Sequence, residues 1–126
     1  MKKQEIKLKN SNFNYSIIIG ENILGELRNR VKSLCPKTKK IAFIIDKNVP
    51  AKFRSILKNK LKSYELTFLY FSATERAKSL YHVNQFLEKL LAKKFNRTDL
   101  IIGVGGGITG DVSGFVASIF KRGLKF

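Results

Sequence analysis

The sequence predicts an α/β fold in which helices flank a parallel sheet. Apolar runs at residues 41–45, 66–71 and 100–104 lack polar alternation, which is typical of parallel strands covered on both faces. A segment with apolar residues at helical spacing follows each run. Strands and helices that alternate in this way form a parallel sheet through right-handed crossovers. We therefore expect one α/β domain built from three strand–helix units.

An antiparallel strand pair and a helix are expected ahead of this sheet. Apolar side chains alternate with others on both sides of a turn at residues 10–12. These side chains are Ile6 and Leu8 before the turn, and Phe13, Tyr15, Ile17 and Ile19 after it. The alternation favours two antiparallel strands ending at Gly20. The apolar residues from 23 to 34 then fit one face of a helix that ends near Pro36.

Three further helices follow the three buried strands. The first opens at Pro50, which suits a first helical turn. Its expected buried face consists of Phe53, Ile56, Leu57 and Leu61. A longer helix runs to about Lys94, and the last covers about residues 109–121. Parallel strands share one carboxyl edge, so the loops at 46–48, 72–78 and 105–111 should lie together where such sheets bind ligands.

The net charge of +16 raises the question of a polyanionic partner. The lysines are spread along the chain, and their densest cluster, at residues 37–40, has no interleaved aromatic residues. Arginine, which recognises phosphates and bases in a forked geometry, is scarce. We therefore expect solvated lysines and no nucleic-acid partner, with a positive field that would help to capture a small anionic substrate.

Three absences favour a cytoplasmic protein that is not attached to a membrane. No apolar run approaches the ~20 residues that span a bilayer. The basic start of the chain is not followed by the apolar core of a secretory signal. The single cysteine, Cys35, forms no internal disulfide and no metal cluster.

The most informative segment is the glycine turn between the strand at 100–104 and the helix after it. Gly105, Gly107 and Gly110 fit the G-x-G-x-x-G pattern of dinucleotide-binding turns, in the right place between strand and helix. Glycine lets the backbone approach a phosphate, which the N–H groups of the helix start then face. The alternative is a tight turn in which Gly110 and Gly114 allow close helix–sheet packing. Asp111 would suit a ribose or nicotinamide partner, or cap the helix.

The neighbouring loops offer four more candidate binding residues, each with an alternative interpretation. Asp46 is placed to accept hydrogen bonds from ribose hydroxyls, and Asn48 would do the same or serve as a helix N-cap. Glu75 would bind a cofactor or form a capping box with Ser72. Lys78 would hold a phosphate or remain a solvated lysine.

Two other residues complete the set of candidates. His82 has no partner histidine at metal-ligand spacing, so we interpret it as a surface or partly packed residue. Arg122 is either a helix C-terminal charge or an anion clamp.

In their order along the chain, these segments resemble the N-terminal domain of the 3-dehydroquinate synthase family. The strongest match is GGGITGDVSGFVASIFKRG, which is similar to the family signature GGG-x-x-GD-x-x-GF-x-A-x-x-x-x-RG. The segments YSIIIG at 15–20, DKNV at 46–49 and ERAKSL at 75–80 fall at the expected intervals. One departure is Thr74, which replaces the glycine that usually precedes the family's glutamate.

The resemblance implies a Rossmann-like fold, NAD as cofactor and a defined set of contacts. The implied NAD contacts are Asp46, Asn48, Glu75, Lys78, Gly106, Gly107, Ile108 and Asp111. Arg122 is implied to reach the phosphate or another anionic group of the substrate. The family converts 3-deoxy-D-arabino-heptulosonate 7-phosphate to 3-dehydroquinate in the shikimate pathway, as an NAD- and metal-dependent lyase.

The resemblance also implies that residues 1–126 are an incomplete N-terminal NAD-binding domain. The family continues with a helical C-terminal domain that carries the ligands of a zinc or cobalt ion, one Glu and two His. This chain has one histidine, so we expect neither a metal ligand nor a catalytic residue within it. A sugar phosphate is the implied substrate, and a homodimer is the implied assembly of the full-length form.

Two alternative functions come from different classes. A related sugar-phosphate cyclase or a metal-dependent polyol dehydrogenase would share the glycine turn, and the GF-x-A-x-x-x-x-RG continuation favours the cyclases. A basic nucleic-acid-binding module would show a steep salt dependence of DNA affinity without NAD binding. It leaves the glycine run unexplained.

We predict that the isolated chain is marginally stable, prone to aggregate and inactive as an enzyme. The helix at 109–121 is apolar nearly all round and needs cover on every side, while the strand expected from Leu124 is cut short. Size-exclusion chromatography and a thermal melt check the first part. A monomer with a sharp cooperative melt would contradict it, as would turnover of the sugar phosphate by the chain supplied with zinc.

Overall fold

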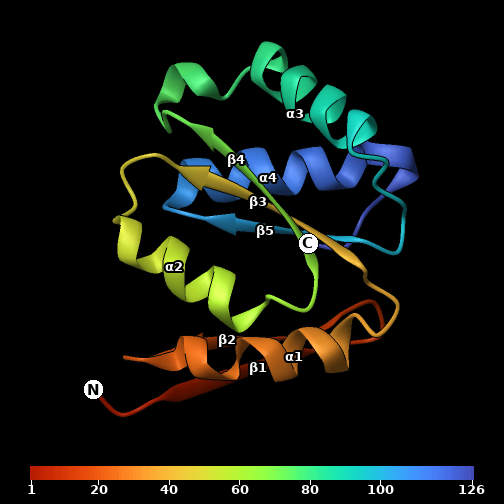
Figure 1. The fold of residues 1–126 in the computed structure, drawn as a ribbon. Helices are drawn as coiled ribbons and strands as arrows, with labels where there is room; N and C mark the ends of the chain where they lie inside the picture. Colours follow the sequence, from red (N-terminus) through yellow and green to blue (C-terminus); the bar gives the residue numbers. More distant parts are fainter.

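A three-stranded parallel sheet forms the centre of the computed structural model, which describes residues 1–126 (Figure 1). Its strands are β3 (Lys40–Asp46), β4 (Glu65–Phe71) and β5 (Leu100–Val104), in the order β4-β3-β5. In the register, Ile41 lies opposite Leu66 on one side and Leu100 on the other. The predicted α/β fold with a parallel sheet is confirmed.

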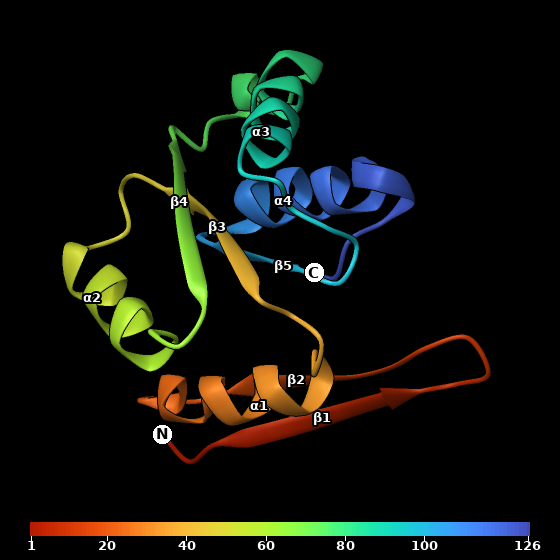
Figure 2. The same cartoon turned by 45° about the vertical axis from the view of Figure 1, so that its right-hand side comes forward.

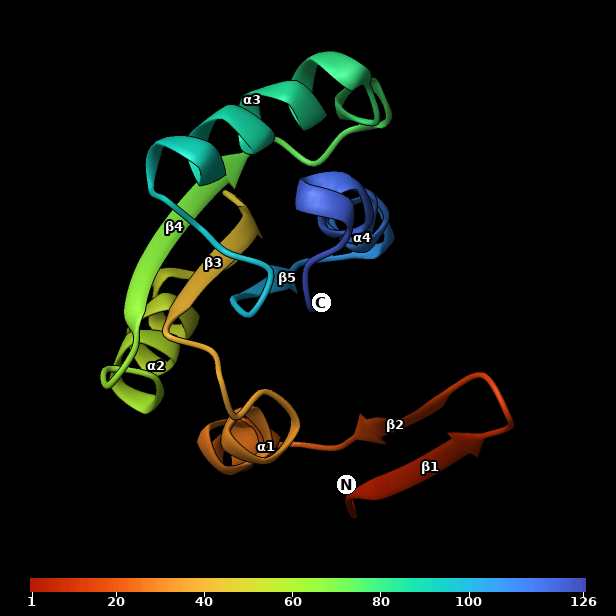
Figure 3. The ribbon, with the colours of Figure 1, turned by 90° about the vertical axis from the view of Figure 1, so that its right-hand side faces the viewer.

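Helices cover both faces of the sheet and bury a separate apolar cluster on each. The helices α3 (Leu80–Ala92) and α4 (Gly107–Ile119) pack on the face that presents Ala42, Ile44 and Ile101. The helices α1 (Leu27–Leu34) and α2 (Ala51–Lys60) pack on the opposite face, against Ile41 and Phe43 (Figure 3). No helix is both long enough and apolar enough to cross a membrane.

The predicted antiparallel pair is also confirmed, and it stands apart from the central sheet (Figure 2). Strands β1 (Gln4–Lys9) and β2 (Asn14–Ile19) pair with Ile6 opposite Ile17. The side chain of Asn10 closes the turn by accepting hydrogen bonds from the backbone N–H groups of residues 12 and 13. An ion pair between Glu5 and Arg30 links the pair to α1.

The edge position of β4 corrects one expectation. The sequence predicted a fully buried strand, but only Leu69 and Phe71 are buried, and Tyr70 is 40% exposed. The reason is that β4 has a neighbouring strand on one side only. Its central neighbour β3 has the pattern expected of a fully covered strand, with residues 41–45 all at 0% exposure.

The start of α3 corrects a second expectation. The proposed capping box of Ser72 and Glu75 is wrong, because Glu75 lies in a separate short 3-10 turn (Glu75–Ala77) that has no side-chain cap. The helix begins later, at Leu80, and Ser79 caps it by accepting a hydrogen bond from the backbone N–H of His82. The extended backbone of Ser79 prevents the turn and the helix from merging.

Close helix–sheet packing occurs at Gly103, which was not one of the two glycines expected, Gly110 and Gly114. A Cβ atom at Gly103 would lie 2.9 Å from Oγ of Ser113, so β5 and α4 approach closely at this point. A Cβ at Gly114 would lie 3.2 Å from the ring of Phe126. Gly110 faces open space, and the packing role given to it is wrong.

The last residues run along the free edge of β5. The N–H of Ile101 donates to the carbonyl of Lys125, and Lys125 pairs with Leu100 in a parallel bridge. The helix before them keeps two large apolar side chains partly in solvent, since Phe115 and Ile119 are each 45% exposed.

A buried carboxylate ties the starts of β3 and β5 together. Asp99 is 2% exposed, and its Oδ1 accepts from the backbone N–H groups of Lys39 (3.2 Å) and Lys40 (2.9 Å). Its Oδ2 accepts from the N–H of Asn96 at 2.8 Å. Beside it, the hydroxyl of Thr38 donates to the carbonyl of Thr98 at 2.7 Å. One side chain thus connects two strands that are sixty positions apart.

We predict that Asp99→Asn lowers the free energy of unfolding by about 1–3 kcal/mol. An amide offers one acceptor oxygen, so a donor N–H would face either the N–H of Asn96 or those of residues 39 and 40. Denaturant unfolding measures the change. The matched control is Glu88→Gln on the exposed side of α3, which should leave the stability within about 0.5 kcal/mol. Equal stability of the Asp99 variant and the wild type would contradict the role of the carboxylate.

Candidate functional site

The predicted loops do lie along one edge of the sheet. Asp46 ends β3 and is opposite Phe71, the last residue of β4, while Val104 ends β5 opposite Ile45. The segments that leave these strands therefore start side by side (Figure 1). They carry every candidate cofactor residue that the sequence indicated.

The three glycines of the turn differ in their surroundings. A side chain at Gly105 would collide with its neighbours, whereas Gly106 and Gly107 face open space. Gly105 has a φ of 156°, and a Cβ there would overlap the side chain of Thr109 and lie 3.3 Å from Cβ of Asp46. Gly106 is the N-cap of α4 and Gly107 its first residue, and nothing lies within 4 Å of a Cβ at either position. The exposed start of a thirteen-residue helix therefore faces an open surface.

Asp46 adjoins this turn and keeps one carboxylate oxygen without a protein partner. Its Oδ1 accepts a hydrogen bond from the backbone N–H of Asn48 at 3.1 Å, while Oδ2 makes no hydrogen bond to the protein. Asn48 is not a helix N-cap, because α2 begins after Pro50 without any side-chain cap. The interpretation of Asn48 as a cap was therefore wrong, and its side chain is exposed in the loop.

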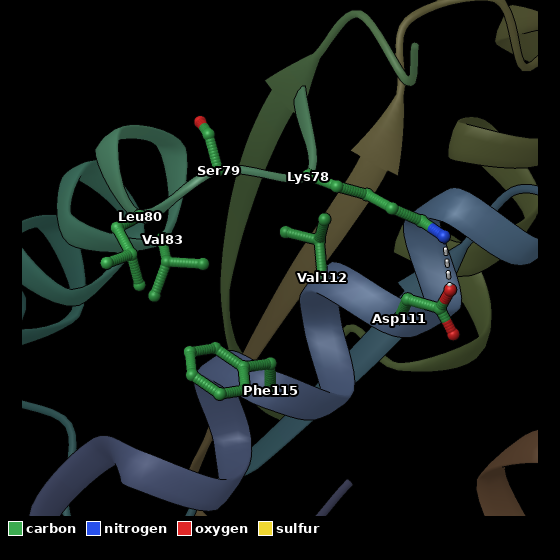
Figure 4. Close-up of a pocket in the computed structure, with 7 residues that line it drawn as sticks. All are labelled: Lys78, Ser79, Leu80, Val83, Asp111, Val112 and Phe115. Atoms are coloured by element: carbon green, nitrogen blue, oxygen red, sulfur yellow. Dashed lines mark ion pairs between the residues drawn. The ribbon is translucent and has the colours of Figure 1, made fainter. Parts of the chain in front are cut away.

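Lys78, which lies just before α3, and Asp111 of α4 form an ion pair at the same edge of the sheet. The Nζ atom of Lys78 lies 2.8 Å from Oδ2 of Asp111, and both side chains are partly exposed (Figure 4). The hydrogen bond and charge of Asp111, with a smaller contribution from Glu75, raise the pKa of Lys78 above its ordinary value of 10.5. Asp111 lies beyond the first turn of α4, so the alternative that it caps the helix is wrong.

A pocket of about 260 Å³ opens beside this ion pair. Val83 of α3 and Val112 and Phe115 of α4 line it together with Lys78 and Asp111 (Figure 4). It therefore combines apolar walls with a charged pair at its rim. The three apolar side chains were missed as site residues. The i, i+3 spacing of Val112 and Phe115 and the i, i+4 spacing of Asp111 and Phe115 could have indicated two of them, whereas Val83 lies on a different helix.

Two further residues discussed from the sequence, Arg122 and His82, do not line this pocket. Arg122 follows the far end of α4, about 20 Å from the glycine turn by the helical rise. Its backbone φ of 67° is left-handed, as is that of Lys121 at 44°. His82 is half-buried, with its Nδ1 2.9 Å from Oγ of Ser79, which confirms a partly packed residue. The role of Arg122 stays a prediction.

We predict that Asp111→Asn moves the pKa of Lys78 back towards its ordinary value. In the wild type the raised pKa stabilises the folded state below about pH 10.5. This contribution is lost as the pH rises through the higher pKa of the folded state. NMR titration of the lysine side chain measures the shift. Glu75→Gln, the matched control, should lower the pKa less, because Glu75 acts only through its charge. An unchanged pKa in the Asp111 variant would refute the pairing in solution.

Comparisons with known proteins now identify the relatives of this chain. Residues 68–126 match the family model described as 3-dehydroquinate synthase N-terminal. The 3-dehydroquinate synthase of Pelagibacter ubique is 45% identical over 97% of this chain, and that of Koribacter versatilis is 33% identical over 94%. The chain covers 33% of each of these proteins, so it spans about a third of the length of the curated relatives it matches.

Solved structures share the fold at lower sequence identity. A crystal structure of 2-deoxy-scyllo-inosose synthase superposes with a TM-score of 0.84 at 24% identity, over 96% of this chain and 34% of that chain. The same kind of enzyme has been solved with carbaglucose-6-phosphate, NAD⁺ and Co²⁺. The resemblance drawn from the sequence is confirmed: the chain is similar to 3-dehydroquinate synthases over about a third of their length, and its second half matches the N-terminal family model.

Proposed function

We propose that residues 1–126 are the NAD-binding part of a 3-dehydroquinate synthase. The complete enzyme would convert 3-deoxy-D-arabino-heptulosonate 7-phosphate to 3-dehydroquinate and phosphate. The observation that carries the proposal is the side-by-side placement of the glycine turn and Asp46 at the carboxyl edge of the sheet. The identity to 3-dehydroquinate synthases across nearly the whole chain supports it.

The residues at this edge fit a dinucleotide. The open surface over Gly106 and Gly107 allows a pyrophosphate to approach the N–H groups at the start of α4, including that of Ile108. The unpaired Oδ2 of Asp46 would accept hydrogen bonds from ribose hydroxyls, with Asn48 next to it. A side chain at position 105 would collide with Thr109, so this approach depends on glycine.

The other end of the dinucleotide would reach the pocket between α3 and α4. Lys78, held by Asp111 and close to Glu75, would orient a polar group at the rim. Val112 and Phe115 would exclude water from one side of it. NAD would supply a reversible hydride acceptor when bound. Residues 1–126 would thus bind and orient the cofactor without performing the elimination or the ring closure.

The metal of the proposed enzyme does not fit within these residues. No group of three or more His, Cys, Asp and Glu side chains is arranged to hold an ion. The one histidine, His82, is paired with Ser79. The metal chemistry of the proposed enzyme would therefore belong to parts outside residues 1–126. A sugar phosphate as substrate, a homodimer of the full-length form and a cytoplasmic location complete the proposal.

A related sugar-phosphate cyclase is the second candidate. The close superposition on 2-deoxy-scyllo-inosose synthase favours it, whereas an NADH-dependent butanol dehydrogenase superposes less well, with a TM-score of 0.61. The two cyclase functions share the cofactor site and differ in the sugar phosphate. Turnover of each sugar phosphate by a longer polypeptide containing this chain would separate them.

We predict that the chain binds NAD and that Asp46→Asn weakens binding about tenfold to a hundredfold, as expected when a hydrogen-bonding carboxylate is lost. Isothermal titration calorimetry measures the dissociation constants. Glu65→Gln, at the opposite end of the sheet, is the control and should bind NAD as the wild type does. Unaltered affinity for NAD in the Asp46 variant would refute the proposed contact between Asp46 and the ribose. A wild-type chain that binds no NAD would overturn the proposed function.

A further inference from the structure

The hydroxyl of Thr109 is the one buried side-chain polar atom that has no hydrogen-bond partner. Thr109 is 0% exposed and lies in the first turn of α4. The other hydroxyls of this helix behave differently. Oγ of Ser113 donates to the carbonyl of Thr109 at 2.6 Å, and Oγ of Ser118 donates to that of Phe115 at 2.7 Å. The lack of a partner is therefore a local property of position 109.

This hydroxyl lies at the junction of the three elements that form the candidate site. A Cβ built on Gly105 would overlap Oγ1 of Thr109 and would also lie 3.3 Å from Cβ of Asp46. The side chain thus supports the glycine turn from inside the protein. A phosphate at the start of α4 would contact the same turn from the opposite, exposed side.

An unpaired buried hydroxyl destabilises the unliganded protein. Because a Cβ built on Gly105 would overlap this hydroxyl, the backbone of Gly105 passes close to it and is the partner we consider. Three consecutive glycines give this turn the conformational freedom to reorient that backbone, since no Cβ restricts Gly106 or Gly107. A ligand that binds more tightly to the reoriented turn than to the free one shifts the population towards it.

We propose that Thr109 is a positioning residue whose hydroxyl gains a backbone partner when a phosphate group binds to the glycine turn. Thr109 then connects the phosphate contact to Asp46 and the end of β3. The unpaired hydroxyl raises the free energy of the unliganded turn, and binding relieves it. The ligand class, a dinucleotide or pyrophosphate, rests on the proposed function.

Two substitutions separate the hydroxyl from the shape of the side chain. Thr109→Val removes the hydroxyl and keeps the volume, whereas Thr109→Ser keeps the hydroxyl and removes a methyl group. Thermal melting of the unliganded chain and calorimetry with inorganic pyrophosphate and with NAD are the readouts. Ser113→Ala is the matched control, because it removes a buried hydroxyl that is already paired.

We expect Thr109→Val to melt at a higher temperature than the wild type and to bind both probes about tenfold more weakly. Thr109→Ser should melt at a lower temperature and retain wild-type affinity. The control should melt at a lower temperature without a change in affinity.

Wild-type affinity for both probes in Thr109→Val, together with a lower melting temperature, would reduce Thr109 to a packing residue and overturn the inference alone. Weakened binding of NAD but not of pyrophosphate would overturn the assignment to the phosphate group. A wild-type chain that binds neither probe would overturn the proposed function together with the inference.

Discussion

The buried carboxylate of Asp99 fixes the geometry on which the site depends. It directly precedes β5 and accepts backbone hydrogen bonds from the start of β3 and from Asn96 in the loop before β5, and so ties the starts of the two paired strands together. Their paired residues run from Ile41 and Leu100 to Ile45 and Val104. Asp46 and Gly105 each come directly after the last pair. A constraint at the amino edge of the sheet therefore brings a carboxylate and a glycine turn together at the opposite edge.

The direction of α4 is set by a second contact, between Gly103 and Ser113. The missing side chain at 103 lets the helix approach β5, and the Ser113 hydroxyl donates back to its own helix at Thr109. With its body held against the sheet, the helix has its N-terminus at the glycine turn and its second turn beside Lys78. The glycine turn and Asp111, the acidic member of the ion pair, are thus held by one helix.

Much of the fold could be predicted because its signals are local and strong. Continuous apolar runs of β-branched and aromatic residues predicted β3 and β5 almost to the residue, and alternation predicted the β1–β2 pair. The errors arose where a short motif competes with tertiary structure. Ser72 and Glu75 have the spacing of a capping box, yet Ser79 caps the helix, because the chain first makes a separate turn.

The candidate site was predictable in its location and less so in its contacts. Parallel topology alone places Asp46, Lys78 and the glycine turn at one edge. The same sequence signature includes Arg122, but α4 lies between the glycine turn and this residue. The two parts of the signature are therefore at opposite ends of the helix. The unpaired hydroxyl of Thr109 has no sequence signal, since it depends on three elements that meet in space.

The placement of Asp111 resolves the main electrostatic difficulty of the motif. A carboxylate near the start of α4 would repel an incoming phosphate, although the helix dipole favours its presence there. Lys78 pairs with it at 2.8 Å, and the same contact raises the pKa of Lys78. Under the proposed function, the backbone N–H groups at Gly107 and Ile108 would then face a phosphate with their partial positive charge largely uncancelled. The acid and the proposed phosphate-binding turn can therefore lie about one turn apart on the same helix, because a lysine from another loop pairs with the acid.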